Sequence, residues 1–378
     1  MKNPFVISGV IPERYFCDRV SETKRLITCM QNQTNLLLTS PRRMGKTQLI
    51  YHAYADESIK DKFYAFYIDI LPSTSLREFT FLLSKEIYKT LVPVGGKALN
   101  LFLSTLKSIK GVISYDFEEC KPKFEIQLGD INAPELTLEE IFNYLQNADR
   151  PCVCTIDEFQ QIGNYPENNV EALLRSYVQK TGNCVFVFAG SDRHTLENMF
   201  NSPAKPFYNS VDHMFLDRID RDVYVAFMQQ MFEEAGRKIA DSACRYLYDI
   251  FEGHTYYVHQ TLHDVFANID ANKIIEEDDI DSVISDIIEN REHSFIMQMF
   301  YLNLIQKETL IAIAKEVQAH EVTSVAFVKK YSLQSPGTVQ NAIRNLLKLQ
   351  ILTYRQEGKK KVYSVSDRFF QIWLKTKY

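Results

Sequence analysis

Four short runs of continuously apolar residues constrain the fold of this chain more than any other feature. They cover residues 34–39, 63–71, 152–159 and 184–191, and the last two end in polar residues. Strands with one solvated face alternate apolar and polar residues, whereas continuous apolar runs are typical of strands covered on both faces. Stretches with helical periodicity separate the runs, so the sequence predicts an α/β protein built on a parallel sheet.

The 378 residues are enough for about two or three domains. We expect residues 1–216 to form the α/β core, with an insertion at about 95–135 that contains a β-hairpin. Residues 217–295 are helical and acidic. Residues 296–378 form a separate segment with its own helices and strands.

The first apolar run leads directly into "SPRRMGKTQLI", which begins at Ser40. The stretch matches the phosphate-loop template G-x-x-x-x-G-K-[ST], except that Ser40 stands in place of the first glycine. Such a loop turns backbone N–H groups toward the anion, and the dipole of the following helix favours negative charge. Gly45 would let the backbone approach closely, Lys46 would reach the β- and γ-phosphates, and the Thr47 hydroxyl would bind Mg²⁺. The alternative interpretation is a strand that meets a helix through a basic turn.

A second acidic motif favours the nucleotide interpretation. The run "CVCTIDEF" ends in Asp157 and Glu158, which places two carboxylates at the carboxyl end of a buried strand. Asp157 would hold the Mg²⁺ directly or through water, and Glu158 would polarise the attacking water. A strand that ends in a solvated acidic turn is common by itself. The same chain also carries a Gly-Lys-Thr loop, and the two motifs together predict a nucleotide-binding core of the P-loop NTPase class.

The run that ends in "AGSDRH" adds further candidates. In a parallel sheet its tip would lie beside the γ-phosphate, so Ser191 or Asp192 is a candidate sensor of that phosphate. Arg193 is a candidate cation for charge that develops during hydrolysis. A polar turn between a strand and a helix is the open alternative.

Several of these stretches resemble the archaeal-type ATPase family, in the STAND branch of the AAA+ and related P-loop ATPases. The family shows a G-P-R-R-x-G-K-T loop where this chain has "SPRRMGKT", and a D-E-F/x-Q motif where it has "IDEFQQI". "FVFAGSDRHTLENMFNSPAKPFY" is similar to its G-S turn and following M-F…P-F-Y segment. "YFCDRVSETKRL" is similar to its F-x-G-R-x-x-E-x-x-L box, and "FEGHTYYVHQTL" to the G-G-x-P-x-x-L-Q segment of its helical lid.

The resemblance implies ATP or ADP binding with Mg²⁺, slow hydrolysis, and a switch between nucleotide states. It makes residues 217–295 a helical lid over the core. Two departures weaken individual contacts, because Asp18 replaces a glycine of the first box and Thr255 stands where the lid usually has proline. The implied nucleotide contacts are Ser40, Pro41, Arg42, Arg43, Met44, Gly45, Lys46, Thr47 and Gln48, with Arg19, Ser191 and Gly253.

After residue 296 we expect a long helix over 301–319, two further helices, and two β-rich runs around Gly358. This order of elements is that of a winged helix-turn-helix domain. "SPGTVQNAIRNLLKLQ" would be its recognition helix, with Ser335 as the cap. On this helix, Leu346, Leu347 and Leu349 would face the core. Arg344 and Lys348 would face a DNA backbone. The wing tip would carry Lys359, Lys360 and Lys361.

Residues 301–378 contain 13 Lys or Arg against 5 Asp or Glu, whereas the other 300 residues carry 30 Lys or Arg against 43 Asp or Glu. This basic segment favours an anionic partner such as DNA, or docking on the acidic body or on another protein.

Other motifs and the composition exclude several classes of protein. No apolar run approaches the roughly 18–20 residues of a membrane span, and the N-terminus is a poor signal peptide, so we expect a cytoplasmic protein. Seven cysteines are expected to be free thiols, and Cys152 and Cys154 lack a second pair for a metal. His259 and His263 copy the spacing of zinc proteases, but Gln260 replaces the glutamate that acts as general base.

The leading hypothesis is a Mg²⁺-dependent ATPase (ATP hydrolase) that acts as a nucleotide-dependent switch. One alternative is a DNA-binding regulator in which the nucleotide is a structural ligand and hydrolysis is negligible. Another is a signalling scaffold with a protein partner or self-association. The predicted fold class is α/β, a P-loop NTPase parallel-sheet core with a helical lid and a C-terminal winged helix-turn-helix domain.

Overall fold

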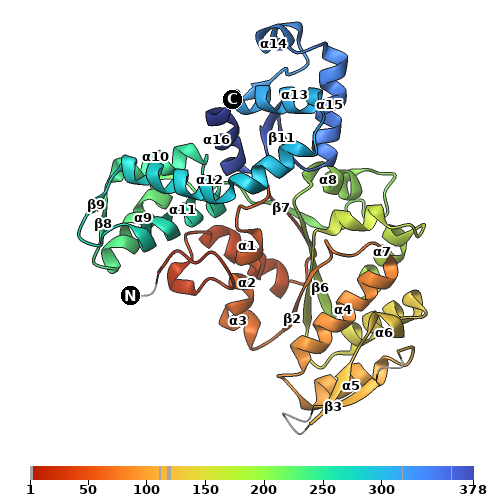
Figure 1. Cartoon of the computed structure of the whole chain (residues 1–378). Helices are drawn as coiled ribbons and strands as arrows, with labels where there is room; N and C mark the ends of the chain where they lie inside the picture. The colour runs from red at the N-terminus through yellow and green to blue at the C-terminus, as the bar shows by residue number, and fades with distance from the viewer. Residues whose placement is uncertain (1–2, 110–111, 117–120, 317, 359) are drawn as a thin grey trace. The chain divides into compact units, whose positions relative to one another are not determined.

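The computed structural model describes residues 3–109, 112–116, 121–316, 318–358 and 360–378 (Figure 1). The chain forms two compact units. One contains residues 8–219, and the other contains residues 220–378 together with residues 1–7.

The unit of residues 8–219 is built on a parallel sheet. In the described part of the chain this sheet has five strands in the order β2-β5-β6-β1-β7, and all neighbouring pairs are parallel. The strands are β1 (Leu36–Thr39), β2 (Tyr64–Asp69), β5 (Cys152–Asp157), β6 (Cys184–Gly190) and β7 (Asp212–Phe215). Four of them coincide with the four apolar runs, so the predicted α/β parallel sheet is confirmed.

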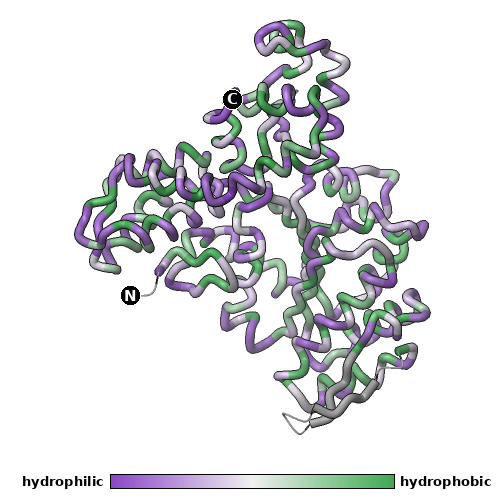
Figure 2. Tube along the Cα trace, in the orientation of Figure 1, coloured by the Kyte–Doolittle hydropathy of each residue, from purple (hydrophilic) through white to green (hydrophobic). Residues whose placement is uncertain are grey.

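Helices cover both faces of this sheet, which is why its central strands are continuously apolar. Leu38 and Val187 belong to one buried cluster, and their sequence neighbours Leu37 and Phe188 belong to the cluster on the opposite face. Burial of one such side chain contributes about 1.5–3 kcal/mol. Figure 1 shows one layer of helices on each side of the strands, and Figure 2 shows hydrophobic and hydrophilic stretches alternating along these helices. The first layer is α1 (Val20–Gln31), α2 (Lys46–Ala55) and α3 (Glu57–Lys60). The second contains α4 (Leu76–Leu91), α5 (Gly96–Thr105), α6 (Pro134–Asn147), α7 (Val170–Lys180) and α8 (Arg193–Asn201).

The predicted hairpin of the insertion is confirmed at the level of the backbone. β3 (Val112–Asp116) and β4 (Lys121–Glu125) pair antiparallel. Short 3-10 helices complete the unit: η1 (Glu13–Tyr15), η2 (Leu128–Asp130) and η3 (Phe159–Asn164).

Strand β7 was not predicted from the sequence. It has four residues, three of them exposed, and it pairs with β1 at the edge of the sheet. β7 lacks the continuous apolar run by which the other four strands were recognised.

The second unit begins with a helical subdomain. It contains α9 (Arg221–Glu234), α10 (Asp241–Ile250), α11 (Thr255–Asn268) and α12 (Glu277–Phe300), with β8 (Lys238–Ile239) and β9 (Ile274–Ile275) paired in parallel. His259 and His263 lie on α11 and contact the N-terminal segment of the chain. The His263 Nδ1 lies 2.8 Å from the carbonyl oxygen of Phe5, and the Phe5 ring packs against the His259 ring. Among the described residues no cluster of His, Cys, Asp and Glu is suited to a metal ion.

The remainder of this unit has the winged-helix arrangement. Its helices are α13 (Leu304–Lys315), α14 (Val325–Lys330), α15 (Pro336–Lys348) and α16 (Arg368–Lys377). Its antiparallel sheet has the order β10-β12-β11, from β10 (Ala319–His320), β11 (Leu352–Glu357) and β12 (Lys360–Val365). The predicted winged helix at the C-terminus is therefore confirmed.

Two details of the C-terminal prediction were wrong. The helix expected over 301–319 is shorter in the structure. Asn303 caps α13 through a capping box with Gln306, so the helix begins at Leu304 and ends at Lys315. Leu349 is 55% exposed and does not face the core, since it is the C-cap residue of α15 and follows the last helical turn.

The six cysteines in the described part of the chain are free and buried, as expected, and Cys120 lies outside the described residues. Cys152 and Cys154 on β5 are buried, and burial raises the pKa of Cys152 to about 12, so the thiol stays protonated. Across the described part of the chain, we find no helix with the length and apolarity of a membrane span.

Candidate nucleotide site

The phosphate-loop sequence joins β1 to α2 at the carboxyl edge of the sheet. Gly45 is the N-cap of α2 with a φ of 88°, and Lys46 is the first residue of the helix. A backbone in the left-handed region favours glycine, because other residues meet steric strain there. The loop therefore ends at a helix N-terminus, which leaves backbone N–H groups without helical partners and favours an anion.

Serine at the first position of the template fits this backbone. Ser40 is buried, its backbone N–H donates to the Gly190 carbonyl (3.3 Å), and its hydroxyl donates to the Pro41 carbonyl (3.0 Å). In the described chain the positive φ angles of the loop fall on Arg43 (67°) and Gly45. Ser40 thus occupies a conformation that does not require glycine.

Lys46 and Asp157 form the centre of the site. The strand order places β6 between β1 and β5, so the residues after β1 and at the end of β5 flank the tip of β6. The Lys46 ammonium donates to the Asp157 Oδ1 and lies 3.8 Å from the Glu158 Oε1. The side chains of Lys46 and Asp157 are 8% and 6% exposed. A buried ion pair is stable only when the remaining polar atoms also have partners.

Those partners come from three segments of the chain. The Asp157 Oδ1 also accepts the backbone N–H of Glu158 at 2.8 Å. The Oδ2 accepts the Tyr67 hydroxyl from β2, and the Thr47 hydroxyl lies 3.5 Å from it. The structure therefore brings together Lys46, Thr47 and Asp157, which the sequence analysis assigned to phosphate and metal binding.

Glu158 is held by a separate set of donors. Its Oε2 accepts the Ser191 hydroxyl at 3.0 Å and the Gln160 side-chain amide. The Arg42 Nε in turn donates to the Ser191 hydroxyl oxygen at 3.3 Å. The tips of β5 and β6 and the phosphate loop are thus joined by one hydrogen-bond network. This network brings Ser191, the predicted phosphate sensor, against the predicted general base.

Burial and charge shift two further groups at this edge. Burial, followed by the negative charge of Asp157, raises the pKa of Tyr67 far above its usual range, so its hydroxyl remains a donor. Burial raises the pKa of Asp69 on β2, and the charges of Asp157 and Glu158 add to this effect.

Tyr67, Asp69 and Gln160 were missed by the sequence analysis. Tyr67 and Asp69 lie within the run 63–71, where their polar groups interrupt the apolar pattern, and this was the available signal. Asp69 pairs in register with Asp157. Gln160 lies inside the "IDEFQQI" motif, but its contact with Glu158 depends on the turn at Glu158, which has a φ of 56°.

Other predicted contact residues have structural partners. Arg19 is buried and binds Glu22 (2.9 Å) and the carbonyl of Asp217 (2.6 Å). The Gln48 side chain accepts a hydrogen bond from the N–H of Ile11 (3.0 Å) and donates one to the Gly9 carbonyl (2.7 Å). Gln48 therefore binds the segment that precedes η1.

Arg193 and Gly253 make contacts with residues other than Lys46 and Asp157. Arg193 donates to Glu197 at 2.6 Å along its own helix, and its guanidinium lies 4.7 Å from the centroid of the Phe215 ring. Gly253 belongs to the unit of residues 220–378, where a Cβ would lie 2.6 Å from the Tyr248 ring at a φ of 69°. Local packing is sufficient to explain this glycine.

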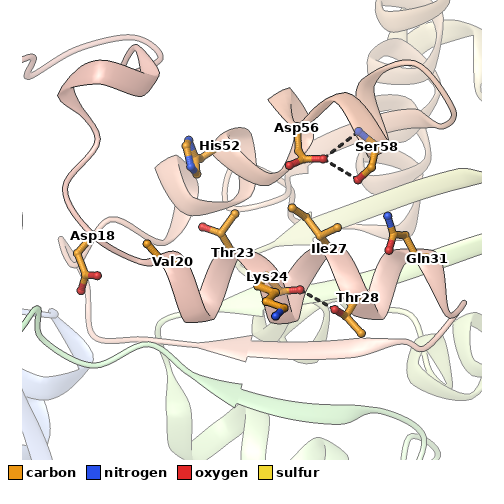
Figure 3. A pocket seen from close by; sticks show the side chains of 10 residues that line it. All are labelled: Asp18, Val20, Thr23, Lys24, Ile27, Thr28, Gln31, His52, Asp56 and Ser58. Atoms are coloured by element: carbon orange, nitrogen blue, oxygen red, sulfur yellow. Dashed lines mark hydrogen bonds between the residues drawn. The ribbon is translucent and has the colours of Figure 1, made fainter.

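A surface pocket of about 410 Å³ lies beside α1 (Figure 3). Its lining includes Thr23, Lys24, His52 and Asp56, and none of its lining residues belongs to the Lys46–Asp157 network. The pocket is therefore distinct from the candidate nucleotide site.

Comparison with known families assigns both parts of the chain. A family model described as an ATPase domain predominantly from Archaea matches residues 16–261. The chain belongs to this archaeal-type ATPase family. A second family model, described as a probable winged helix domain, matches residues 293–376 of this chain.

Individual relatives agree with this assignment. An uncharacterized ATP-binding protein of Methanocaldococcus jannaschii is 26% identical over 271 residues, which cover 63% of this chain and 68% of that protein. A Walker-type ATPase of Pyrococcus abyssi has 15% identity and a TM-score of 0.65, over 98% of this chain and 99% of that chain. The ORC2 protein of Aeropyrum pernix, solved as ADPNP–ADP complexes, has 12% identity and a TM-score of 0.58, over 100% and 97%. At these identities the two structures show that the archaeal-type ATPase shares their fold.

Proposed function

We propose that this archaeal-type ATPase binds ATP with Mg²⁺ at the Lys46–Asp157 site, hydrolyses it slowly, and changes state with the bound nucleotide. The observation that carries the proposal is the convergence of two strand tips. Lys46 and Thr47 follow β1, Asp157 ends β5, and all three meet within hydrogen-bond reach. Family membership and the ATP-binding relative support the choice of nucleotide.

The donor set at this point fits Mg²⁺. The ion prefers oxygen ligands and is usually held by one or two carboxylates or hydroxyls together with phosphate oxygens. The Thr47 hydroxyl and the Asp157 carboxylate supply such oxygens 3.5 Å apart. Bound Mg²⁺ would neutralise charge on the phosphates.

The protein's own residues would divide the remaining work. The loop backbone and the N-terminus of α2 would bind the phosphates, and Lys46 would exchange its contact with Asp157 for a phosphate oxygen. Glu158 would accept a proton from the attacking water, and Ser191 would orient Glu158 through the hydrogen bond described above.

Two variants test this assignment. Lys46→Ala should abolish tight binding of Mg·ATP in calorimetry, because it removes the cation at the phosphates. Glu158→Gln should bind Mg·ATP like the wild type, and its turnover should fall about 10²–10⁴-fold, since the amide cannot accept a proton.

Lys62→Ala is the matched control, because Lys62 is exposed in the same unit and away from the loop. An undiminished hydrolysis rate in Glu158→Gln would exclude Glu158 as the base. Wild-type affinity in Lys46→Ala would exclude the site itself.

DNA is a second candidate ligand, favoured by the exposed face of α15. Gln340, Asn341, Arg344, Asn345 and Lys348 are all exposed along this helix, and it combines amide and basic side chains that bind bases and phosphates. The rival is then a DNA-binding regulator with negligible hydrolysis. DNA-stimulated turnover would favour the ATPase with a DNA partner, and salt-sensitive DNA binding without turnover would favour the regulator.

The two described lysines of the predicted wing tip have partners within the protein. Lys360 pairs with Glu321 at 2.7 Å, and the Lys361 ammonium lies 4.2 Å from the centroid of the Tyr354 ring. Lys359 lies outside the described residues. We therefore assign the proposed DNA contact chiefly to α15.

A further inference from the structure

The Tyr67 hydroxyl donates a hydrogen bond to Asp157, the central carboxylate of the site. Tyr67 is uncharged and lies outside both the phosphate loop and the Asp-Glu motif. It lies on β2, the strand that pairs with β5, two residues before Asp69. Its hydroxyl donates to the Asp157 Oδ2 and lies 3.3 Å from the Thr47 hydroxyl oxygen. One phenol thus contacts both residues that would hold Mg²⁺.

The Tyr67 ring is itself held in place. Its centroid lies 4.9 Å from that of Tyr51 on α2, with the planes tilted by 41°, and the ring packs against the apolar cluster beneath α1 and α2. A rigid ring fixes the position of its hydroxyl, and the hydroxyl restrains rotation of the carboxylate.

The donors around Asp157 are divided between its two oxygens. The Oδ1 accepts the Lys46 ammonium and the Glu158 backbone N–H, both of which are supplied by the recognised motifs. The Oδ2 accepts the Tyr67 hydroxyl. Because a phenol carries no charge, it orients this oxygen without competing electrostatically with a cation.

Residues that hydrogen-bond to metal ligands set the orientation of those ligands, and their loss typically weakens metal affinity by about 10–100-fold. We propose that Tyr67 is a positioning residue that orients the Asp157 carboxylate and the Thr47 hydroxyl toward the Mg²⁺ of a bound nucleotide. The inference rests on the proposed function and assigns a role that neither the phosphate loop nor the Asp-Glu motif contains.

Tyr67→Phe in the full chain tests this role. The variant keeps the ring and its packing and removes only the hydroxyl. Binding of a fluorescent ATP analogue is titrated with Mg²⁺, and is measured separately in EDTA. We expect unchanged affinity in EDTA and about a 10–100-fold higher Mg²⁺ concentration for half-maximal tightening.

Tyr51→Phe is the matched control, since it removes a hydroxyl from the neighbouring ring and leaves the Tyr67 hydroxyl in place. It should titrate with Mg²⁺ like the wild type. Circular dichroism melting establishes that each variant is folded.

The outcomes separate the inference from the proposed function. If Mg²⁺ does not tighten binding to the wild type, the proposed Mg²⁺ site fails, whatever the variant does. If the wild type responds and Tyr67→Phe responds at the same Mg²⁺ concentration, the positioning role is overturned. Equal losses of affinity in Mg²⁺ and in EDTA would also overturn it, because they would show a structural role.

A double-mutant cycle with Asp157→Asn gives a second readout. If Tyr67 acts through Asp157, Tyr67→Phe should change the Mg²⁺ midpoint little in the Asp157→Asn background. Additive effects of the two substitutions would contradict the inference. The cycle remains informative if Tyr67→Phe lowers stability, because both backgrounds carry that loss.

Discussion

The Asp157 carboxylate accepts hydrogen bonds from residues that are far apart in the sequence. Lys46 follows β1, Tyr67 lies on β2 and the Glu158 N–H lies at the end of β5. Removing one partner of a buried pair leaves an uncompensated charge, which costs about 3–5 kcal/mol. Variants such as Lys46→Ala therefore need a stability measurement beside each binding measurement.

Gly190 at the end of β6 controls the contact between Gln160 and Glu158. A Cβ at this position would lie 2.1 Å from the Gln160 Oε1 and 2.8 Å from the Leu196 Cδ1. Gly190→Ala should displace Gln160 from Glu158 and lower the free energy of unfolding by about 1–3 kcal/mol, which is typical of overpacking. Urea unfolding followed by fluorescence measures this change.

Gly182→Ala provides the comparison for Gly190→Ala. Its Cβ would meet only the Gln146 Oε1, at 3.9 Å, which is an ordinary van der Waals distance. We expect less than about 1 kcal/mol of change there. Equal stability of the two alanine variants would contradict the steric argument at Gly190.

Among the helices, α11 has the additional task of holding the N-terminal segment. The Asn3 side chain donates to the His263 carbonyl at 2.9 Å, and the Phe5 ring packs against Phe232 and His259. His259 is surrounded by aromatic rings, and burial lowers its pKa to about 4. The imidazole is consequently neutral in the folded unit at neutral pH.

This burial predicts a pH dependence of stability. Unfolding returns the pKa of His259 to about 6.5, so below that pH the unfolded chain binds a proton that the folded chain does not. The contribution is fully present above pH 6.5 and is lost as the pH falls toward 4, at ~1.4 kcal/mol per pH unit. Chemical unfolding at several pH values between 7 and 4 measures it.

Carboxylates also titrate in this range, so the prediction concerns the difference from His259→Leu. The variant should lose less stability between pH 6.5 and 4 than the wild type does. His213→Gln, which removes an exposed histidine of β7, should follow the wild type. Parallel curves for the wild type and His259→Leu would refute the role of this buried imidazole.

For the whole molecule, charge is divided between an acidic body and a basic C-terminal segment. The 13 basic and 5 acidic residues of 301–378 include the exposed Arg344 and Lys348 on α15. An arginine–lysine pair that contacts phosphates makes binding depend steeply on salt, because counterions are released. This face is the expected origin of any DNA binding by the winged helix.

Arg344→Ala combined with Lys348→Ala should weaken duplex DNA binding and lower the salt slope by about 1 for each phosphate that is no longer neutralised. Fluorescence anisotropy of a labelled duplex at several salt concentrations measures both quantities. Lys375→Ala with Lys377→Ala removes the same charge from α16 and is the control. Equal effects of the two pairs would indicate non-specific attraction, and no duplex binding by the wild type would remove the DNA candidate.

The inner strands, the phosphate loop and the acidic strand end were predictable because each depends on local pattern. Continuous apolarity marks β1, β5 and β6, and Gly45 with Lys46 marks the start of α2. The winged helix was predictable for the same reason, since caps and turns such as Ser335 and Gly358 are local signals. The sequence by itself therefore determined the fold class and the residues most suited to phosphate binding.

Tertiary structure alone decided which side chains meet. The pairing of β2 with β5 brings Tyr67 to Asp157, although 90 residues separate them in the chain. Folding likewise sets the register of β7 at the edge of the sheet and the pairing of Lys360 with Glu321. Such contacts depend on strand order and on the directions of side chains from separate elements, which periodicity within one segment does not encode.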